Sequence, residues 1–116
     1  MSSTGPTSLP VTIHFAPGSH PPAAGTLRVR LLDVTYSDAP SVTLVERRFP
    51  FAPNSPLRFE LPVSEVDPAR TYSVTVHLDR HGDGRIRPGD YINTQRYAVL
   101  TFGHGAAVEV ELHRVL

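Results

Sequence analysis

Residues 57–79 read LRFELPVSEVDPARTYSVTVHLD, and they contain the pattern that decides the fold. Apolar and polar side chains alternate along residues 57–61 and again along residues 72–78. A period of two residues is typical of a β-strand with one buried face and one solvated face. Pro68 lies in the connection, where proline removes a ladder donor and fixes a turn. The stretch therefore predicts two half-buried strands joined by a turn.

Tyr72 stands where the second of these strands begins. In some β-sandwiches a tyrosine at this point hydrogen-bonds through its hydroxyl to backbone a few residues upstream, an arrangement called a tyrosine corner. The alternative is that Tyr72 is an ordinary aromatic side chain at the edge of the core. The sequence leaves both interpretations open.

The alternation extends over most of the chain, and Pro- and Gly-rich turns separate the runs. No amphipathic helix of useful length can be drawn. Short strands at this spacing are typical of an all-β domain. We therefore predict a single antiparallel β-sandwich of seven to eight strands, immunoglobulin- or transthyretin-like, over residues 11–116, preceded by a flexible tail at 1–10. Besides the two strands above, the expected strands are 11–15, 27–31, 42–49, 96–102 and 108–112.

Composition excludes several classes of function. The 116 residues carry 11 basic and 11 acidic side chains, a net charge of zero, and no cysteine. This length fits one domain. Zero net charge argues against nucleic acid as a partner, and no apolar run is long enough to span a membrane. Without cysteine there is no disulfide framework, thiolate chemistry or cysteine-based zinc site.

Residues 79–90, DRHGDGRIRPGD, have the spacing of a calcium-binding loop. Asp79, Asp83 and Asp90 occupy its first, fifth and twelfth positions, and the backbone carbonyl of Arg85 would supply a further oxygen. Calcium takes six to eight oxygen ligands, which alternate residues of a tight loop can direct inward. The pattern predicts a weak Ca²⁺ site.

Two features of the loop favour a different interpretation. His81 stands at the third position, where an oxygen ligand is expected and where imidazole better suits zinc or copper. Arginines balance the carboxylates, so that the alternative is a hairpin in which aspartates cap backbone N–H groups and pair with arginine. In the calcium interpretation, Ile86 would anchor the loop to the core. The candidate metal residues are Asp79, His81, Asp83, Arg85 and Asp90.

Nothing in the chain indicates catalysis. There is no nucleophile elbow, no phosphate-binding glycine loop and no histidine spacing typical of a zinc enzyme. The histidines, including His14 and His77, are expected on solvated strand faces or in loops. We therefore expect a non-enzymatic protein with no catalytic residues and no cofactor other than the calcium considered above.

Three stretches together resemble the YbaY/YscW family of small bacterial β-sandwich proteins. They are GTLRVRLLDVTYSDAP at 25–40, PLRFELPVSEVDPARTYSVTVHLD at 56–79 and GDYINTQRYAVLT at 89–101. Members of that family are often lipoproteins, and some are type III secretion pilotins. The resemblance implies a binding or assembly-assisting domain; the alternative function is a structural domain stabilised by calcium at 79–90, with no partner role.

The expected partner is a protein or peptide that pairs with an exposed edge strand, since a small sandwich offers unpaired backbone there. The chain itself is expected to be a monomer or a weak homodimer. The compartment depends on Met1. If Met1 is the native start, the protein is cytoplasmic, and if an export segment was removed, it is periplasmic or associated with the outer membrane.

Overall fold

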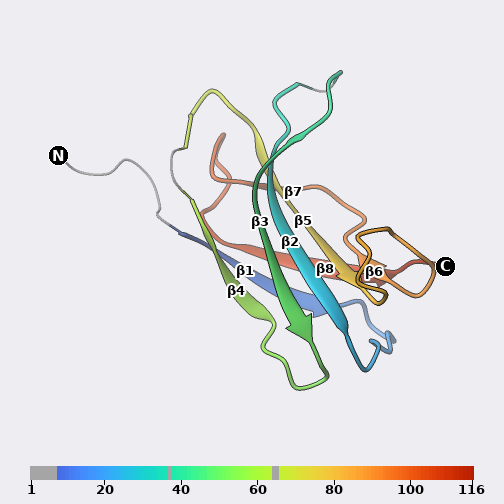
Figure 1. The fold of residues 1–116 in the computed structure, drawn as a ribbon. Coiled ribbons are helices and arrows are strands. Elements are labelled where there is room, and N and C mark those ends of the chain that lie inside the picture. Colours follow the sequence, from blue (N-terminus) through green and yellow to red (C-terminus); the bar gives the residue numbers. More distant parts are fainter. Residues whose placement is uncertain (1–7, 37, 64–65) are drawn as a thin grey trace.

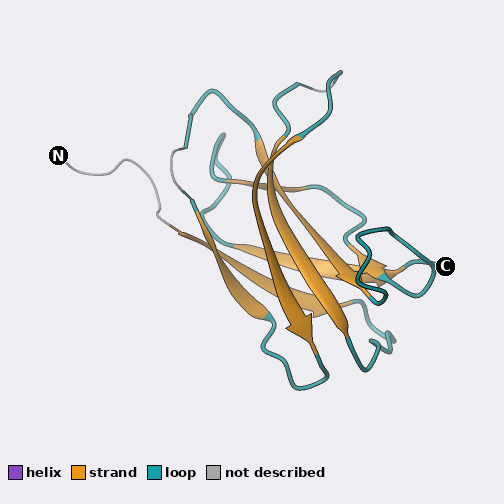
Figure 2. Cartoon of the chain, in the orientation of Figure 1, coloured by secondary structure: helices purple, strands orange, loops and turns teal. Residues whose placement is uncertain are grey.

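The computed structural model describes residues 8–36, 38–63 and 66–116. Within these ranges the chain forms eight strands and no helix (Figure 2). The strands are β1 (Ser8–Phe15), β2 (Gly25–Asp33), β3 (Val42–Phe51), β4 (Arg58–Pro62), β5 (Tyr72–Asp79), β6 (Tyr91–Ile92), β7 (Tyr97–Val99) and β8 (Val108–Arg114).

The strands pair in the order β3-β2-β5-β6-β8-β1-β4, and β7 adds to β5 beyond the short β6. In Figure 1, β2, β3 and β5 cross in front of β1 and β8. The two-residue β6 pairs with both β5 and β8, so it joins the two halves into one strongly curved sheet. Phe49 of β3 stacks on Phe59 of β4 at 4.1 Å between ring centroids, which brings the two edges together at one end. The result is a nearly closed, barrel-like sheet.

The all-β class and the number of strands are therefore confirmed, whereas the immunoglobulin- or transthyretin-like sandwich is not established. One pairing also departs from the expected antiparallel arrangement, because β1 and β8 run parallel. These are the first and last strands of the chain, so the rest of the domain supplies the long connection that parallel neighbours need. β1 moreover begins at Ser8, earlier than the expected Val11, with Leu9 fully buried. The prediction of a flexible tail at 1–10 is therefore wrong for residues 8–10, and residues 1–7 lie outside the described residues.

The core fills the space enclosed by the curved sheet. The alternating apolar side chains of β1, β2, β5 and β8 point inward, as the period of two predicted. Tyr91 and Phe51 each pack edge-on against Phe15 at the end where β1 finishes. The largest side chains with almost no exposed surface include Tyr91, Leu9, Ile13, Leu27, Leu61, Leu78 and Leu112.

Tyr72 forms the predicted corner. Its hydroxyl accepts a hydrogen bond of 2.9 Å from the backbone N–H of Asp67. The ring itself is buried in the core. The tyrosine therefore ties the connection between β4 and β5 to the start of β5, and this interpretation of the sequence is confirmed.

The loops gather at two ends of the sheet (Figure 1). One end, called here the apolar end, holds the loops that follow β2, β4 and β7. Arg70 connects them, because its guanidinium donates to Asp33 at 3.0 Å and its carbonyl accepts from the Thr101 hydroxyl at 2.6 Å. The other end, called the basic end, holds the loops that follow β1, β3 and β5, together with the last residues of the chain.

Candidate functional site

The loop between β5 and β6 folds back over the outer face of β5. Beneath it lies a cluster of buried polar side chains: Arg28 of β2, His77 and Asp79 of β5, and Asp90 just before β6. Arg28 and His77 are neighbours across the β2–β5 ladder. Because the loop covers them, β5 is buried on both faces at this end.

Asp79 organises the first half of this loop. Its Oδ1 accepts hydrogen bonds from the backbone N–H groups of His81 at 3.0 Å and Gly82 at 2.8 Å. Its Oδ2 accepts from the Gly84 N–H at 2.7 Å and from Arg28 Nε at 3.2 Å. Burial acts to raise the pKa of Asp79, but these donors outweigh it and hold the pKa below its usual value.

Asp90 organises the second half in the same manner. Its Oδ1 accepts from the Arg80 N–H at 3.0 Å, while its Oδ2 accepts from the Arg87 N–H at 3.1 Å and lies 2.8 Å from His77 Nε2. Burial again acts to raise the pKa of Asp90, and the hydrogen bonds from His77 and the two backbone groups lower it overall. The two buried aspartates thus pin both sides of the loop to the sheet.

The other candidate residues lie apart from this cluster. Asp83 is bound at the exposed tip, where it accepts from the Arg85 N–H at 3.0 Å and from Arg87 Nε at 2.8 Å. The hydrogen bond from the Arg87 side chain lowers the pKa of Asp83 to about 2. His81 and Arg85 are exposed. Ile86 is exposed too, so the expectation that it anchors the loop to the core is wrong: backbone hydrogen bonds to buried carboxylates hold the loop instead.

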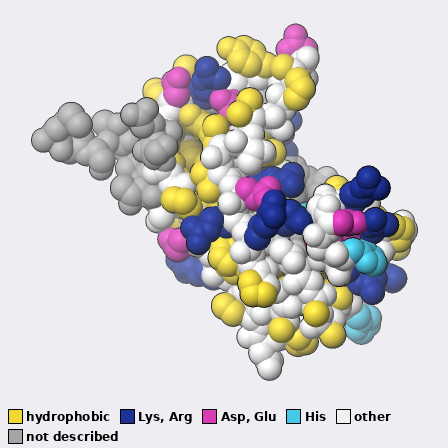
Figure 3. Space-filling view, viewed as in Figure 1, with side chains coloured by type: hydrophobic (Ala, Val, Ile, Leu, Met, Phe, Trp, Pro, Cys, Tyr) yellow, Lys and Arg dark blue, Asp and Glu magenta, His cyan; other side chains and the backbone are white. Residues whose placement is uncertain are grey.

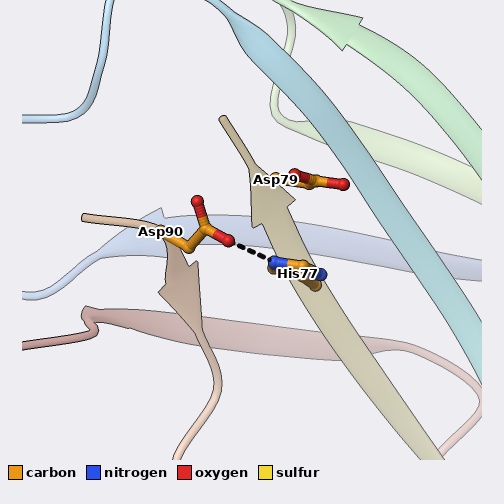
Figure 4. Close-up of side chains that lie close together, drawn as sticks. All are labelled: His77, Asp79 and Asp90. Carbon is orange, nitrogen blue, oxygen red and sulfur yellow. Dashed lines mark hydrogen bonds and ion pairs between the residues drawn. The ribbon is translucent and has the colours of Figure 1, made fainter. Parts of the chain in front are cut away.

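Three side chains in the described part of the chain could offer ligand atoms to one metal ion. They are His77, Asp79 and Asp90, whose ligand atoms lie within 4.8 Å of one another. Figure 4 shows His77 bonded to Asp90, with the carboxylate of Asp79 directed away from Asp90. Of the five residues expected from the sequence, this set retains only Asp79 and Asp90.

The geometry supports the hairpin alternative for this loop and gives no support to calcium. Both oxygens of Asp79 and both oxygens of Asp90 already accept hydrogen bonds. Arg28 adds a buried positive charge on Asp79. A cation would have to displace these donors before it gained a ligand.

His77 belongs to this buried cluster, although the sequence predicted that it would be exposed. The alternation put His77 on a solvated face, but the residue is buried. The alternation gives the side of the sheet correctly and cannot tell that a loop covers that side. A signal was present in the two-residue spacing of His77 and Asp79, which places both on one face of β5.

The strand order ends at β3 and β4, which both carry interruptions, and the three-residue β7 pairs with β5 alone among the described strands. In β3 the register shifts so that Leu44 is an extra residue opposite β2, which is a β-bulge. Pro50 lies near the end of β3 and Pro62 at the end of β4. Bulges and prolines oppose strand addition, so these edges are poorly suited to a new backbone ladder.

Apolar side chains are instead exposed at the apolar end. Tyr36 is 63% exposed, Val42 58%, Leu44 47% and Phe102 65%. Figure 3 shows hydrophobic side chains gathered at the upper tip, where Figure 1 places the loop between β2 and β3. Phe102 also has a positive φ of 56°, which is uncommon for a bulky residue. We call Tyr36, Val42 and Leu44 the β3 apolar surface.

No helix in the described residues is long and apolar enough to cross a membrane. No curated protein sequence matches the chain. A solved structure of an alternative pilotin from the type II secretion system of Vibrio cholerae is similar, with a TM-score of 0.77 and 24% sequence identity. The match covers 94% of this chain and 96% of that one, and it shows a shared fold.

A family model matches residues 7–112, which is nearly the whole chain. That family is described as the type III secretion system lipoprotein chaperone, YscW. The match agrees with the resemblance drawn from residues 25–40, 56–79 and 89–101. The chain therefore belongs to the YscW family of secretion-system lipoprotein chaperones.

Proposed function

We propose that this protein is a non-enzymatic assembly chaperone of a bacterial secretion system, and that it acts as a pilotin toward a secretin. The family supports the chaperone role, and the similar structure is that of a pilotin. The polar side chains of the buried cluster are hydrogen-bonded to one another, Arg28 to Asp79 and His77 to Asp90.

The β3 apolar surface is the contact that we propose for the partner. The observation that carries this choice is the exposure of Val42 and Leu44 on a strand that pairs only with β2 along this half. β3 approaches β4 at the opposite half, through Phe49 and Phe59. Exposed apolar side chains next to an open strand edge suit an apolar segment of another protein.

The bulge at Leu44 affects how a partner would bind. A straight strand added to β3 would lose regular hydrogen bonding at the bulge. We therefore propose that side-chain packing on the β3 apolar surface provides most of the affinity, and that backbone pairing beside it is secondary. The compartment that goes with this role is the periplasm, at the outer membrane.

The test pairs two charge substitutions with a control on the same fold. Val42→Arg and Leu44→Arg, made singly and together, place one or two charges on the β3 apolar surface, while Ile86→Arg places one charge at a similarly exposed apolar residue of the basic end and is the control for the single variants. Binding to the purified secretin of the same organism's secretion system is measured by calorimetry. The double variant is expected to bind at least about tenfold more weakly, since buried anchors contribute more than 1 kcal/mol each.

The Ile86→Arg variant is expected to bind like the wild type. Equal binding by the wild type and all variants would contradict the proposed surface, and no binding by the wild type would contradict the pilotin role. Sedimentation at micromolar and near-millimolar concentration tests self-association separately. A dimer that the double variant abolishes would mean that a second copy, and not a secretin, occupies this surface.

A further inference from the structure

A concavity of about 320 Å³ opens at the basic end, away from the β3 apolar surface. Three parts of the chain build it: the loop after β1, the loop between β5 and β6 with the first residue of β6, and the end of β8. We call it the arginine pocket. Its lining residues are His20, Pro22, Arg80, Gly89, Tyr91 and Arg114.

Arg80 and Arg114 have no acidic partner among the described residues, although most other arginines do. Carboxylates pair with Arg28, Arg30, Arg48, Arg58, Arg70 and Arg87. The backbone N–H of Arg80 binds Asp90, but no hydrogen bond is made by its guanidinium to a described residue. Figure 3 shows several arginine and histidine side chains, with acidic side chains among them, on the right side of the molecule, where Figure 1 places the basic end. The pocket thus concentrates uncompensated positive charge.

Gly89 sets the position of Arg80. A Cβ added at Gly89 would lie 2.3 Å from Arg80 Nη1, so the guanidinium packs directly against the glycine. The φ of Gly89 is +92°, a backbone conformation that side-chain-bearing residues rarely adopt. The backbone geometry before β6 therefore leaves room for the Arg80 head group at the wall of the pocket.

Tyr91 adds a neutral donor at the pocket. The residue is only 2% exposed, yet its hydroxyl makes no hydrogen bond to a described residue. By contrast, the hydroxyls of Tyr72 and Tyr97 each accept a backbone N–H. No buried side-chain polar atom in the described part of the chain lacks a partner. The Tyr91 hydroxyl must therefore reach solvent, and the pocket that it lines is where it does so.

We propose that the arginine pocket binds a phosphate-type oxyanion. Two guanidinium groups match the charge of a phosphate, and their planar forks match its oxygen geometry. The Tyr91 hydroxyl can donate to a further oxygen. None of the described residues that line the pocket is acidic. Its volume of about 320 Å³ leaves space for a group attached to the phosphate, so the ligand is either free phosphate or the head group of a lipid.

The first experiment titrates inorganic phosphate into the intact protein and follows backbone amide shifts, against chloride at matched ionic strength. Arg80→Ala and Arg114→Ala are each expected to weaken phosphate binding about tenfold, since each removes charge-assisted hydrogen bonds. Tyr91→Phe keeps the aromatic ring packed in the core and removes only the hydroxyl, so it is expected to weaken phosphate binding about threefold. Neither guanidinium makes a hydrogen bond or an ion pair to a described residue, so the variants are expected to keep the wild-type spectrum away from the pocket.

Arg96→Ala is the matched control, because Arg96 is also exposed, has no acidic partner among the described residues, and lies outside the pocket. Its phosphate affinity is expected to stay within about twofold of wild type. The proposal is overturned if phosphate shifts no resonances near the pocket, or if Arg96→Ala weakens binding as much as Arg80→Ala does.

A second arm separates the two sources of phosphate. The protein is mixed with vesicles of phosphatidylglycerol or of phosphatidylcholine, with and without Arg80→Ala. A lipid ligand predicts sedimentation with phosphatidylglycerol vesicles that Arg80→Ala reduces and Arg96→Ala does not. A soluble ligand predicts phosphate binding without vesicle binding. Vesicle binding that both variants reduce equally would indicate diffuse charge attraction and would overturn the lipid assignment.

Discussion

The two ends of the sheet hold their loops by different means. At the basic end, Asp79 and Asp90 are fully buried and accept hydrogen bonds from the loop that covers them. At the apolar end, Arg70 and the Tyr72 hydroxyl connect the loops through a few partly buried bonds, and large apolar side chains stay exposed. At the basic end, the buried carboxylates accept the hydrogen bonds of the loop backbone, so the loop needs no partner to hold it in place. At the apolar end, large apolar side chains remain exposed, and another molecule can cover them.

The largest expected effect tests the buried charge at the basic end. Asp79→Ala removes the nearer and fully buried of the two carboxylates that pair with the buried Arg28, and it leaves three loop N–H groups without their acceptor. Breaking a buried ion pair from one side costs about 3–5 kcal/mol of unfolding free energy. Urea denaturation measures this. Asp83→Ala, in the same loop but at its exposed tip, is the control and should change stability far less.

The next effect belongs to the apolar end. Tyr72→Phe leaves the Asp67 N–H without its acceptor and should lower the unfolding free energy by about 1–2 kcal/mol. Tyr36→Phe is the control, because Tyr36 is exposed and its hydroxyl is free to bind water. If thermal unfolding of Tyr72→Phe matches that of the wild type, the corner contributes no stability and the ring alone matters.

Acid should weaken the loop at the basic end. The pKa values of Asp79 and Asp90 are held below the ordinary value of 3.8 in the folded protein. Their contribution to stability is therefore complete above pH 3.8 and is lost as the pH falls from there through the folded pKa values. Amide exchange in the loop between β5 and β6 should therefore rise over this range, because both carboxylates that hold the loop lose their charge. Exchange in this loop that stays unchanged as the pH falls below 3.8 would contradict the role given to the two carboxylates.

The smallest expected effect concerns metal at the same loop. Because Asp79 and Asp90 already accept hydrogen bonds at all four oxygens, the melting temperature should be equal in EDTA and in about 5 mM Ca²⁺. A rise of a few degrees that Asp83→Asn abolishes would favour the calcium interpretation over the hairpin. Magnesium at the same concentration is the control for ionic strength.

The sequence predicted those parts of the fold that depend on local pattern. Alternation located the strands, and Tyr72 with the preceding Pro68 predicted the corner. It could not predict β6, because two residues are too few to show a period. It also could not predict the parallel pairing of β1 and β8, which brings residues about 97 positions apart into register and leaves no trace in either strand.

The candidate site was predictable only in part, for a related reason. The spacing of Asp79, Asp83 and Asp90 fits both a metal loop and a hairpin stitched by hydrogen bonds. What distinguishes them is Arg28, which lies 51 residues from Asp79 in sequence and reaches it only through the β2–β5 pairing. The exposed residues of β3 were missed because the sequence does not indicate where a barrel-like sheet stays open.

The parallel pairing of β1 with β8 gives the molecule a defined response to tension. The chain enters β1 at Ser8 and leaves β8 at Arg114, and these points lie at opposite ends of the sheet. A force that pulls on both would load the register from Val11↔Val108 to Phe15↔Leu112 along the strands, so its hydrogen bonds would have to shear together and could not unzip one at a time. The protein should therefore resist stretching between its termini far better than stretching applied across β3 and β4.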